Sequence, residues 1–166
     1  MNRIATAIFF LFSTVGNAAA ASSFAGEFLS LGAGARALAL GSAYVAVADD
    51  PTAVYWNPAG LTRLPQRQLH LTHAERFAGM INHDFAAIAL PGKRLHWLGL
   101  ALLRVGVNNI HFTELADPGR QLSQTNRPYI ASTETSADYA LYLSLAHRPR
   151  TSFSLGASVK VIYRQI

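Results

Sequence analysis

The chain contains no cysteine among its 166 residues, and beyond its first 20 residues it lacks any apolar run of 18 or more. The first absence excludes disulfide bonds. A transmembrane helix needs about 20 consecutive apolar residues, so the second absence excludes a helical membrane protein. It does not exclude a membrane protein that crosses the bilayer with β-strands. The net charge of +5 is only mildly basic, and we expect no nucleic-acid partner.

The first 21 residues have the pattern of a secretory signal peptide. Arg3 supplies the positive charge, residues 4–16 are apolar, and residues 18–21 are the small side chains that signal peptidase requires. The alternative is a membrane anchor, but the apolar stretch is well short of the roughly 20 residues that a bilayer needs. We therefore expect residues 1–21 to be cleaved during export.

Five stretches between residues 67 and 166 are expected to be β-strands. They are residues 68–76, 83–90, 95–107, 136–146 and 151–164. The last two alternate between apolar and mostly polar positions, which is typical of a strand with two unlike faces. Their apolar positions are the expected lipid-facing residues: Tyr139, Leu141, Leu143, Leu145, Phe153, Leu155, Val159, Val161 and Tyr163. Residues 95–107 are apolar on both faces, so a buried helix is an alternative there, although flanking turns favour a strand.

The connections between these strands differ in length. Residues 91–94 and 147–150 are compact basic turns, whereas residues 108–135 form a long polar segment that we expect to be a loop. Short turns on one side and a long loop on the other are typical of an outer-membrane barrel. If the first strand starts on the periplasmic side, both basic turns lie there and the long loop lies outside the cell.

Residues 22–66 are rich in glycine and alanine, and we expect them to form a plug, or hatch, inside a barrel. Asp50 and Pro51 make a sound helix start, and Pro58 would end that helix after Trp56. Arg36 is expected to pair with acids of the barrel lumen, because an unpaired charge in a narrow lumen is costly. The segment's candidate site residues are Gly32, Gly34, Arg36, Gly41, Asp49, Asp50, Tyr55, Trp56, Asn57, Pro58, Ala59 and Gly60.

Enzymatic and metal-binding functions find little support in these residues. Gly32, Gly34 and Ala37 mimic a dinucleotide-binding fingerprint, but the preceding strand and the crossover helix that this motif needs are missing. His70 and His73 would face opposite sides of a strand. We expect no catalytic residue, no metal ligand and no cofactor.

The three runs LGAGARA, GSAYVAVADD and AVYWNPAGL, at residues 31–37, 41–50 and 53–61, resemble the N-terminal signature of PorV/PorQ-type proteins. These belong to the superfamily of the long-chain fatty acid transporter FadL. The resemblance covers about 35 residues, and the strand pattern behind it agrees with the same architecture. It implies an all-β fold, an antiparallel outer-membrane barrel of about 14 strands with an N-terminal hatch. Only about five strands fit here, so we expect the chain to be the N-terminal part of a longer protein or a truncated gene product.

The resemblance implies uptake of hydrophobic compounds, such as long-chain fatty acids, across the bacterial outer membrane. Outer-membrane lipid and a hydrophobic small molecule are the expected partners. The alternative is a barrel that transports nothing and serves as a secretion partner, as PorV does in type IX secretion, or as a structural partner. A more remote alternative is a soluble periplasmic β domain.

Aromatic side chains give two further expectations. Tyr139, Tyr163 and Trp97 lie near strand ends, where amphipathic rings prefer the membrane interface, with core packing as the alternative. Tyr55 and Trp56 are expected to anchor the hatch to the barrel wall, or alternatively to line a ligand path.

Overall fold

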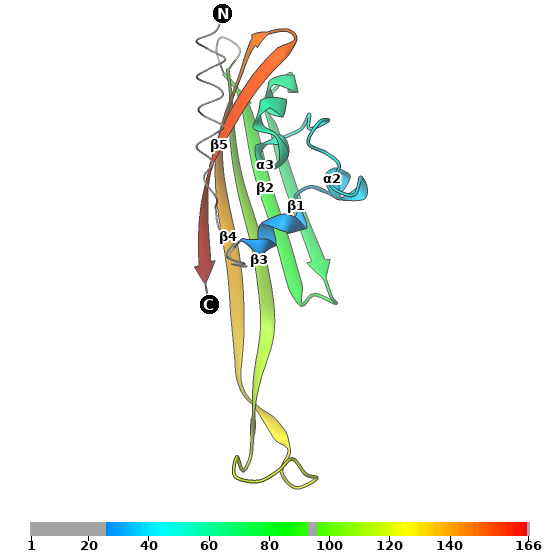
Figure 1. Cartoon of the computed structure of the whole chain (residues 1–166), viewed down its shortest axis with the longest axis vertical. Helices are drawn as coiled ribbons and strands as arrows, with labels where there is room; N and C mark the ends of the chain where they lie inside the picture. Colours follow the sequence, from blue (N-terminus) through cyan, green and yellow to red (C-terminus); the bar gives the residue numbers. More distant parts are fainter. Residues whose placement is uncertain (1–25, 93–95, 166) are drawn as a thin grey trace, which may run out of the picture.

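The computed structural model describes residues 26–92 and 96–165. These residues form one five-stranded antiparallel sheet, with short helical segments from the N-terminal part lying against one of its faces (Figure 1). The predicted signal peptide lies outside the described residues. The fold is therefore mostly β, as the alternating sequence predicts.

Each strand pairs with its sequence neighbour. The strands are β1 (Gln68–Arg76), β2 (Ile81–Pro91), β3 (His96–Leu115), β4 (Pro128–Arg150) and β5 (Phe153–Gln165), and they lie in the order β1-β2-β3-β4-β5. All five predicted strands are confirmed, including residues 96–107, for which a buried helix was the alternative. Antiparallel neighbours need no crossover, so local pairing alone builds this sheet.

The long loop predicted for residues 108–135 is mostly wrong. β3 and β4 continue to pair beyond the other strands, from Ile110 opposite Glu134 to Leu115 opposite Pro128. These polar residues pair through their backbone groups. A register shift between Val107 and Ile110 marks an irregularity, and the two strands pair again beyond it. The result is a hairpin arm that projects from the sheet (Figure 1).

The tip of this arm is organised by one asparagine. Asn126 is buried, accepts a hydrogen bond from the backbone nitrogen of Asp117 at 2.9 Å, and donates to the carbonyl oxygens of Asp117 and Arg120 at 2.9 and 3.1 Å. Side-chain bonds of this kind replace the backbone ladder where a strand pair ends. The tip is thus an ordered loop of residues 116–127.

The basic turn predicted at residues 147–150 lies a few residues further along the chain. β4 continues to Arg150, and the chain reverses at residues 151–152, with a register shift between His147 and Arg150. Pro149 falls within this irregularity, where its missing N–H removes no ladder hydrogen bond. Residues 147–150 are therefore the end of a strand and not a turn.

The N-terminal segment, defined here as residues 26–64, contains four short helices. They are η1 (Glu27–Leu31), α2 (Ala35–Ala39), α3 (Ala53–Trp56) and η2 (Pro58–Arg63). The predicted end of a helix at Trp56, before Pro58, is confirmed. Asp50 accepts a hydrogen bond from the backbone nitrogen of Thr52 at 2.8 Å, so it stabilises the turn that leads into α3, which begins two residues later than Pro51.

The core lies between the N-terminal segment and the face of the sheet that it covers, called the inner face here. Phe85, Leu103 and Tyr142 point inward from β2, β3 and β4 and are buried, and Tyr44 and Leu61 meet them from the N-terminal segment. The opposite side of the sheet, the outer face, has no part of the described chain against it. Period-two alternation thus separates a packed face from an open one.

Candidate functional site

The outer face carries three consecutive cross-strand rows of aliphatic side chains, which we call the apolar belt. Register places the members of each row side by side on neighbouring strands. The first row is Leu71, Ala86, Leu102, Leu141 and Val161; the second is Leu69, Ile88, Leu100, Leu143 and Val159; the third is Leu90, Leu98, Leu145 and Ala157.

The belt is open to its surroundings. Exposure of its large side chains is 68% at Leu71 and 39% at Leu100, in the middle of the sheet, while Ile88, Leu90 and Leu98 are half-buried. Soluble monomers rarely expose contiguous apolar patches larger than a few hundred Å², and such patches mark interaction surfaces. All the predicted lipid-facing residues lie on this outer face. The sequence missed Leu69, Leu71, Leu100 and Leu102, because β1 is too polar and β3 too uniformly apolar to reveal which side faces outward.

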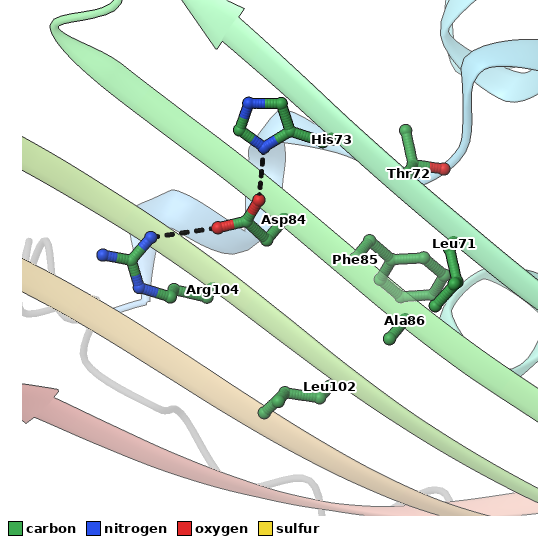
Figure 2. Close-up of a pocket in the computed structure, with 8 residues that line it drawn as sticks. All are labelled: Leu71, Thr72, His73, Asp84, Phe85, Ala86, Leu102 and Arg104. Atoms are coloured by element: carbon green, nitrogen blue, oxygen red, sulfur yellow. Dashed lines mark hydrogen bonds and ion pairs between the residues drawn. The ribbon is translucent and has the colours of Figure 1, made fainter.

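One end of the belt is bounded by a row of polar and aromatic side chains. The row runs across all five strands: His73, Asp84, Arg104, Tyr139 and Tyr163. Asp84 lies between its neighbours, with one carboxylate oxygen 2.6 Å from Nδ1 of His73 and the other 2.9 Å from Nη1 of Arg104 (Figure 2). Below this cluster a shallow groove of about 450 Å³ leads toward Leu71 and Leu102.

Aromatic rings continue this boundary. The rings of Tyr139 and Tyr163 lie 6.2 Å apart, and the Arg104 guanidinium lies 6.0 Å from the Tyr139 ring centre. Beyond them, Arg164 forms a two-bond ion pair with Asp138 on the inner side, at 2.6 and 3.0 Å. The row next to the first aliphatic row of the belt therefore already consists of aromatic and charged side chains.

The opposite end of the belt is bounded by histidines. His96 and His147 are cross-strand partners with stacked rings 4.3 Å apart. Trp97, expected at a membrane interface, instead points to the inner face, where its indole nitrogen donates to the carbonyl oxygen of Leu64 at 3.3 Å. Odd positions of β3 face inward, so Trp97 packs under the N-terminal segment and that expectation was wrong.

On the inner face, the predicted motif residues come together as one folded unit. The Trp56 indole donates to the carbonyl oxygen of Ala33 at 2.8 Å, and Asn57 bonds the carbonyl oxygen of Val45 at 3.0 Å. The Tyr55 hydroxyl donates to the carbonyl oxygen of Leu29. Each of these bonds joins stretches at least 12 residues apart, so the separated runs of the motif fold against one another.

Two glycines of the motif have a clear steric role. Gly34 has a φ of 84°, and a Cβ there would lie 2.8 Å from Cγ2 of Thr52. A Cβ at Gly60 would lie 2.3 Å from the carbonyl oxygen of Ala48. A side chain at either position would therefore force the neighbouring atoms to shift. Gly41 has a φ of 63° with open space around it, so its requirement is conformational only.

The charged residues of the motif pair within the segment. Arg36 donates to Asp49 at 2.6 Å and to the Tyr44 hydroxyl at 3.1 Å, and that hydroxyl donates to Asp50 at 2.8 Å. Arg36 was expected to pair with acids of the lumen, and within the described residues its acidic partner is Asp49 of the same segment. Burial raises the pKa of Tyr44 to about 12, and its hydrogen bond to Asp50 acts in the same direction.

The segment is joined to the sheet mainly through η2 and α3. A Cβ at Gly156 of β5 would lie 2.2 Å from the backbone nitrogen of Ala59, and one at Gly99 of β3 would lie 2.4 Å from Cγ2 of Val54. The Thr62 hydroxyl donates to Ser154 at 2.8 Å. Tyr55 also packs edge-on against Phe85 of β2, with ring centres 6.3 Å apart.

Two side chains of the inner face are buried with unpaired polar atoms. Both ring nitrogens of His83 and the hydroxyl of Tyr142 have no hydrogen-bond partner within the described residues. His83 and Tyr142 are 1% and 0% exposed. A buried polar group without a hydrogen-bond partner lowers the stability of the fold, so each of these groups is a candidate for a functional role.

No metal centre is formed by the described residues. His70 and His73 lie on opposite faces of β1: the first contacts Thr72 at 2.7 Å on the inner side, and the second contacts Asp84 on the outer side. No group of three histidine, aspartate or glutamate residues is placed to hold a metal ion in the described ranges.

The comparisons with known proteins add no relative. No family model matches the chain. No curated protein matches it, and no solved structure does. Within residues 26–92 and 96–165, no helix is both long and apolar enough to cross a membrane.

Proposed function

We propose that this chain forms wall strands and the plug of an outer-membrane β-barrel that takes up hydrophobic compounds, such as long-chain fatty acids. The observation that carries the proposal is the apolar belt, whose three aliphatic rows cross four or five strands and are covered by nothing in the described chain. Hydrocarbon is the environment in which such a surface is stable without a protein partner.

The dimensions of the belt support this environment. Tyr139 and His147, the two ends of the belt on β4, are eight residues apart, which at about 3.3 Å per residue gives about 26 Å along the strand. A tilt of about 40° reduces this to about 20 Å along the membrane normal, close to the roughly 25 Å apolar band of outer-membrane barrels. The tyrosine row then lies at one interface and the histidine pair at the other.

The N-terminal segment supplies the plug in this proposal. It covers the inner face and folds on its own hydrogen bonds, so it can act as a unit that blocks the lumen. The turn between β4 and β5 lies on the periplasmic side and the β3–β4 arm outside the cell. The proposal includes no catalytic step.

Transport of an amphipathic molecule is supported by the unpaired polar atoms under the plug. The Tyr142 hydroxyl and the His83 ring lie among apolar side chains of the inner face, and a few polar groups in an apolar lining are typical of small-molecule sites. In this proposal, displacement of the plug lets these atoms contact the polar end of a passing ligand.

Uptake of a labelled long-chain fatty acid by cells that produce the protein tests this role. Tyr142→Phe removes an unpaired hydroxyl, so stability should be unchanged or higher while uptake falls several-fold. Tyr139→Phe, on the outer face, is the matched control and should leave uptake unchanged. Uptake no greater than in cells without the protein would contradict the transport proposal.

A second candidate function is that of a non-transporting secretion or structural partner. It is favoured by the β3–β4 arm, which projects from the sheet and exposes Phe112, Tyr129 and Ile130 at 52–56%. Aromatic side chains are enriched in protein interfaces. An absence of uptake together with normal membrane insertion would favour this role.

A further inference from the structure

A polar pocket of about 380 Å³ lies where η2 meets the turn between β4 and β5. Its lining residues include two arginines, Arg63 and Arg148, and three residues that carry hydroxyl groups, Thr151, Ser152 and Ser154. No carboxylate is among its lining residues. Its volume is within the range of about 300–1,000 Å³ that is typical of small-molecule sites.

Each arginine is held by one backbone contact. Arg63 donates from Nη1 to the carbonyl oxygen of Ala46 at 2.8 Å, and Arg148 donates from Nη2 to the carbonyl oxygen of Thr151. A guanidinium has five N–H donors, so each keeps donors for another acceptor. No ion pair joins either arginine to an acid within the described part of the chain.

Arg148 also has a buried donor atom that lacks an acceptor in the part of the chain that the structure describes. Its Nε is buried and has no hydrogen-bond partner among the described residues. A buried N–H of a charged group without an acceptor is costly, and the two arginines bring two positive charges of like sign to one pocket. An anion in the pocket would satisfy both the donor and the charge.

We propose that this pocket binds the phosphate group of a phosphate ester, with Arg63 and Arg148 as its main ligands. Arginine binds phosphate through paired N–H donors, and hydroxyl groups complete the set of hydrogen bonds around a tetrahedral anion. The pocket is larger than one phosphate group, which leaves room for an attached organic group. Such a ligand bridges the plug and the wall, because Arg63 belongs to η2 and Arg148 to β4.

The ester has two possible sources that share this chemistry. One is a soluble phosphomonoester, and the other is the head group of a phospholipid. The second is within reach because Phe153, which also lines the pocket, is 53% exposed on the outer face beside the apolar belt. The proposal does not rest on uptake of hydrophobic compounds, and its soluble arm does not require a membrane.

Calorimetric titration of the full chain in non-ionic detergent with glycerol phosphate tests the site. We expect saturable binding that becomes at least about tenfold weaker in Arg63→Gln and in Arg148→Gln, because each loses a charged hydrogen-bond donor set. Arg150→Gln is the matched control, since Arg150 is on the same strand end but does not line the pocket. Circular dichroism checks that each variant folds, and exposed Arg63 carries the test if Arg148→Gln does not fold.

Mixed micelles containing phosphatidic acid distinguish the two sources. If phosphatidic acid competes with glycerol phosphate, and the competition is lost in Arg63→Gln, the ligand is a lipid phosphate. If glycerol phosphate binds and phosphatidic acid does not compete with it, the ligand is a soluble ester. The proposal is overturned if neither ligand binds saturably, or if Arg150→Gln weakens binding as much as the other two variants.

Discussion

Gly156 of β5 lies directly against Ala59 of the N-terminal segment: a Cβ at position 156 would be 2.2 Å from the Ala59 backbone nitrogen and 2.5 Å from the carbonyl carbon of Pro58. The neighbour is backbone, so no side-chain rotation relieves the overlap. This contact joins the Asn-Pro-Ala-Gly stretch of the motif to a strand almost 100 residues later.

Gly156→Ala should therefore loosen the N-terminal segment. Overpacking of this kind costs about 1–3 kcal/mol. We expect faster proteolysis of residues 26–64 and a lower midpoint in urea unfolding. Ala157→Val, one position along and on the outer face, is the control and should change stability by less than about 0.5 kcal/mol. Equal effects of the two substitutions would contradict the close contact.

Asn57→Ala tests the junction between α3 and η2. Asn57 accepts from the backbone nitrogen of Ala59 at 3.2 Å and donates to the carbonyl oxygen of Val45 at 3.0 Å. Loss of the cap should cost about 1 kcal/mol, measured by urea unfolding. Asn57→Asp keeps the accepting oxygen and loses the donor, so its stability should be intermediate. A full loss in Asn57→Asp would mean that the bond to Val45 carries the whole effect.

Leu143→Arg tests the environment of the apolar belt. Leu143 lies in the middle row, and in a membrane an arginine there should cost about 2–4 kcal/mol in folding into lipid vesicles. Glu75→Arg, on the outer face of β1 beyond the polar row, is the control and should cost at most about 1 kcal/mol. Leu143→Arg without any penalty would argue for a water-exposed sheet.

Tyr44 should make the N-terminal segment sensitive to alkaline pH. Its folded pKa of about 12 is above the ordinary value of 10.0, so the neutral hydroxyl is favoured in the folded state. Its contribution to stability is complete below pH 10 and is lost as the pH rises through 12. Proteolysis of residues 26–64 should increase over this window, and Tyr44→Phe should remove that part of the increase. An unchanged pH profile in Tyr44→Phe would be against this assignment.

The sequence predicted the strands because period-two alternation reports which side chains face which way. It predicted β4 and β5 best, where polar residues such as Ser144 and Ser158 alternate with leucines and valines. It failed at residues 108–135, because a hairpin that leaves the sheet has both faces exposed and loses the alternation. Backbone hydrogen bonds between β3 and β4, and not burial of apolar side chains, stabilise that arm. Backbone pairing of this kind does not show in the amino-acid composition.

Of the candidate site, the sequence predicted the motif residues of the N-terminal segment but not the groups that join distant strands. The motif residues of the N-terminal segment stand close together in sequence, so they were recognisable as a set, although the partner of Arg36 depended on how the segment folds on itself. The row formed by His73, Asp84 and Arg104 joins three strands, and no local pattern connects its members. The pocket at Arg63 and Arg148 depends in the same way on a contact between distant segments.

In the proposed barrel, the outer face lies in hydrocarbon and the inner face does not. Adjacent positions on β5 test it most directly, because Val159 points outward and Lys160 inward. The chain has no cysteine, so Val159→Cys and Lys160→Cys each give one site for a nitroxide label in protein reconstituted into lipid vesicles. We expect oxygen, which concentrates in lipid, to dominate the relaxation of the label at 159, and a water-soluble nickel complex to dominate the relaxation of the label at 160. Equal access of the nickel complex to both positions would contradict it.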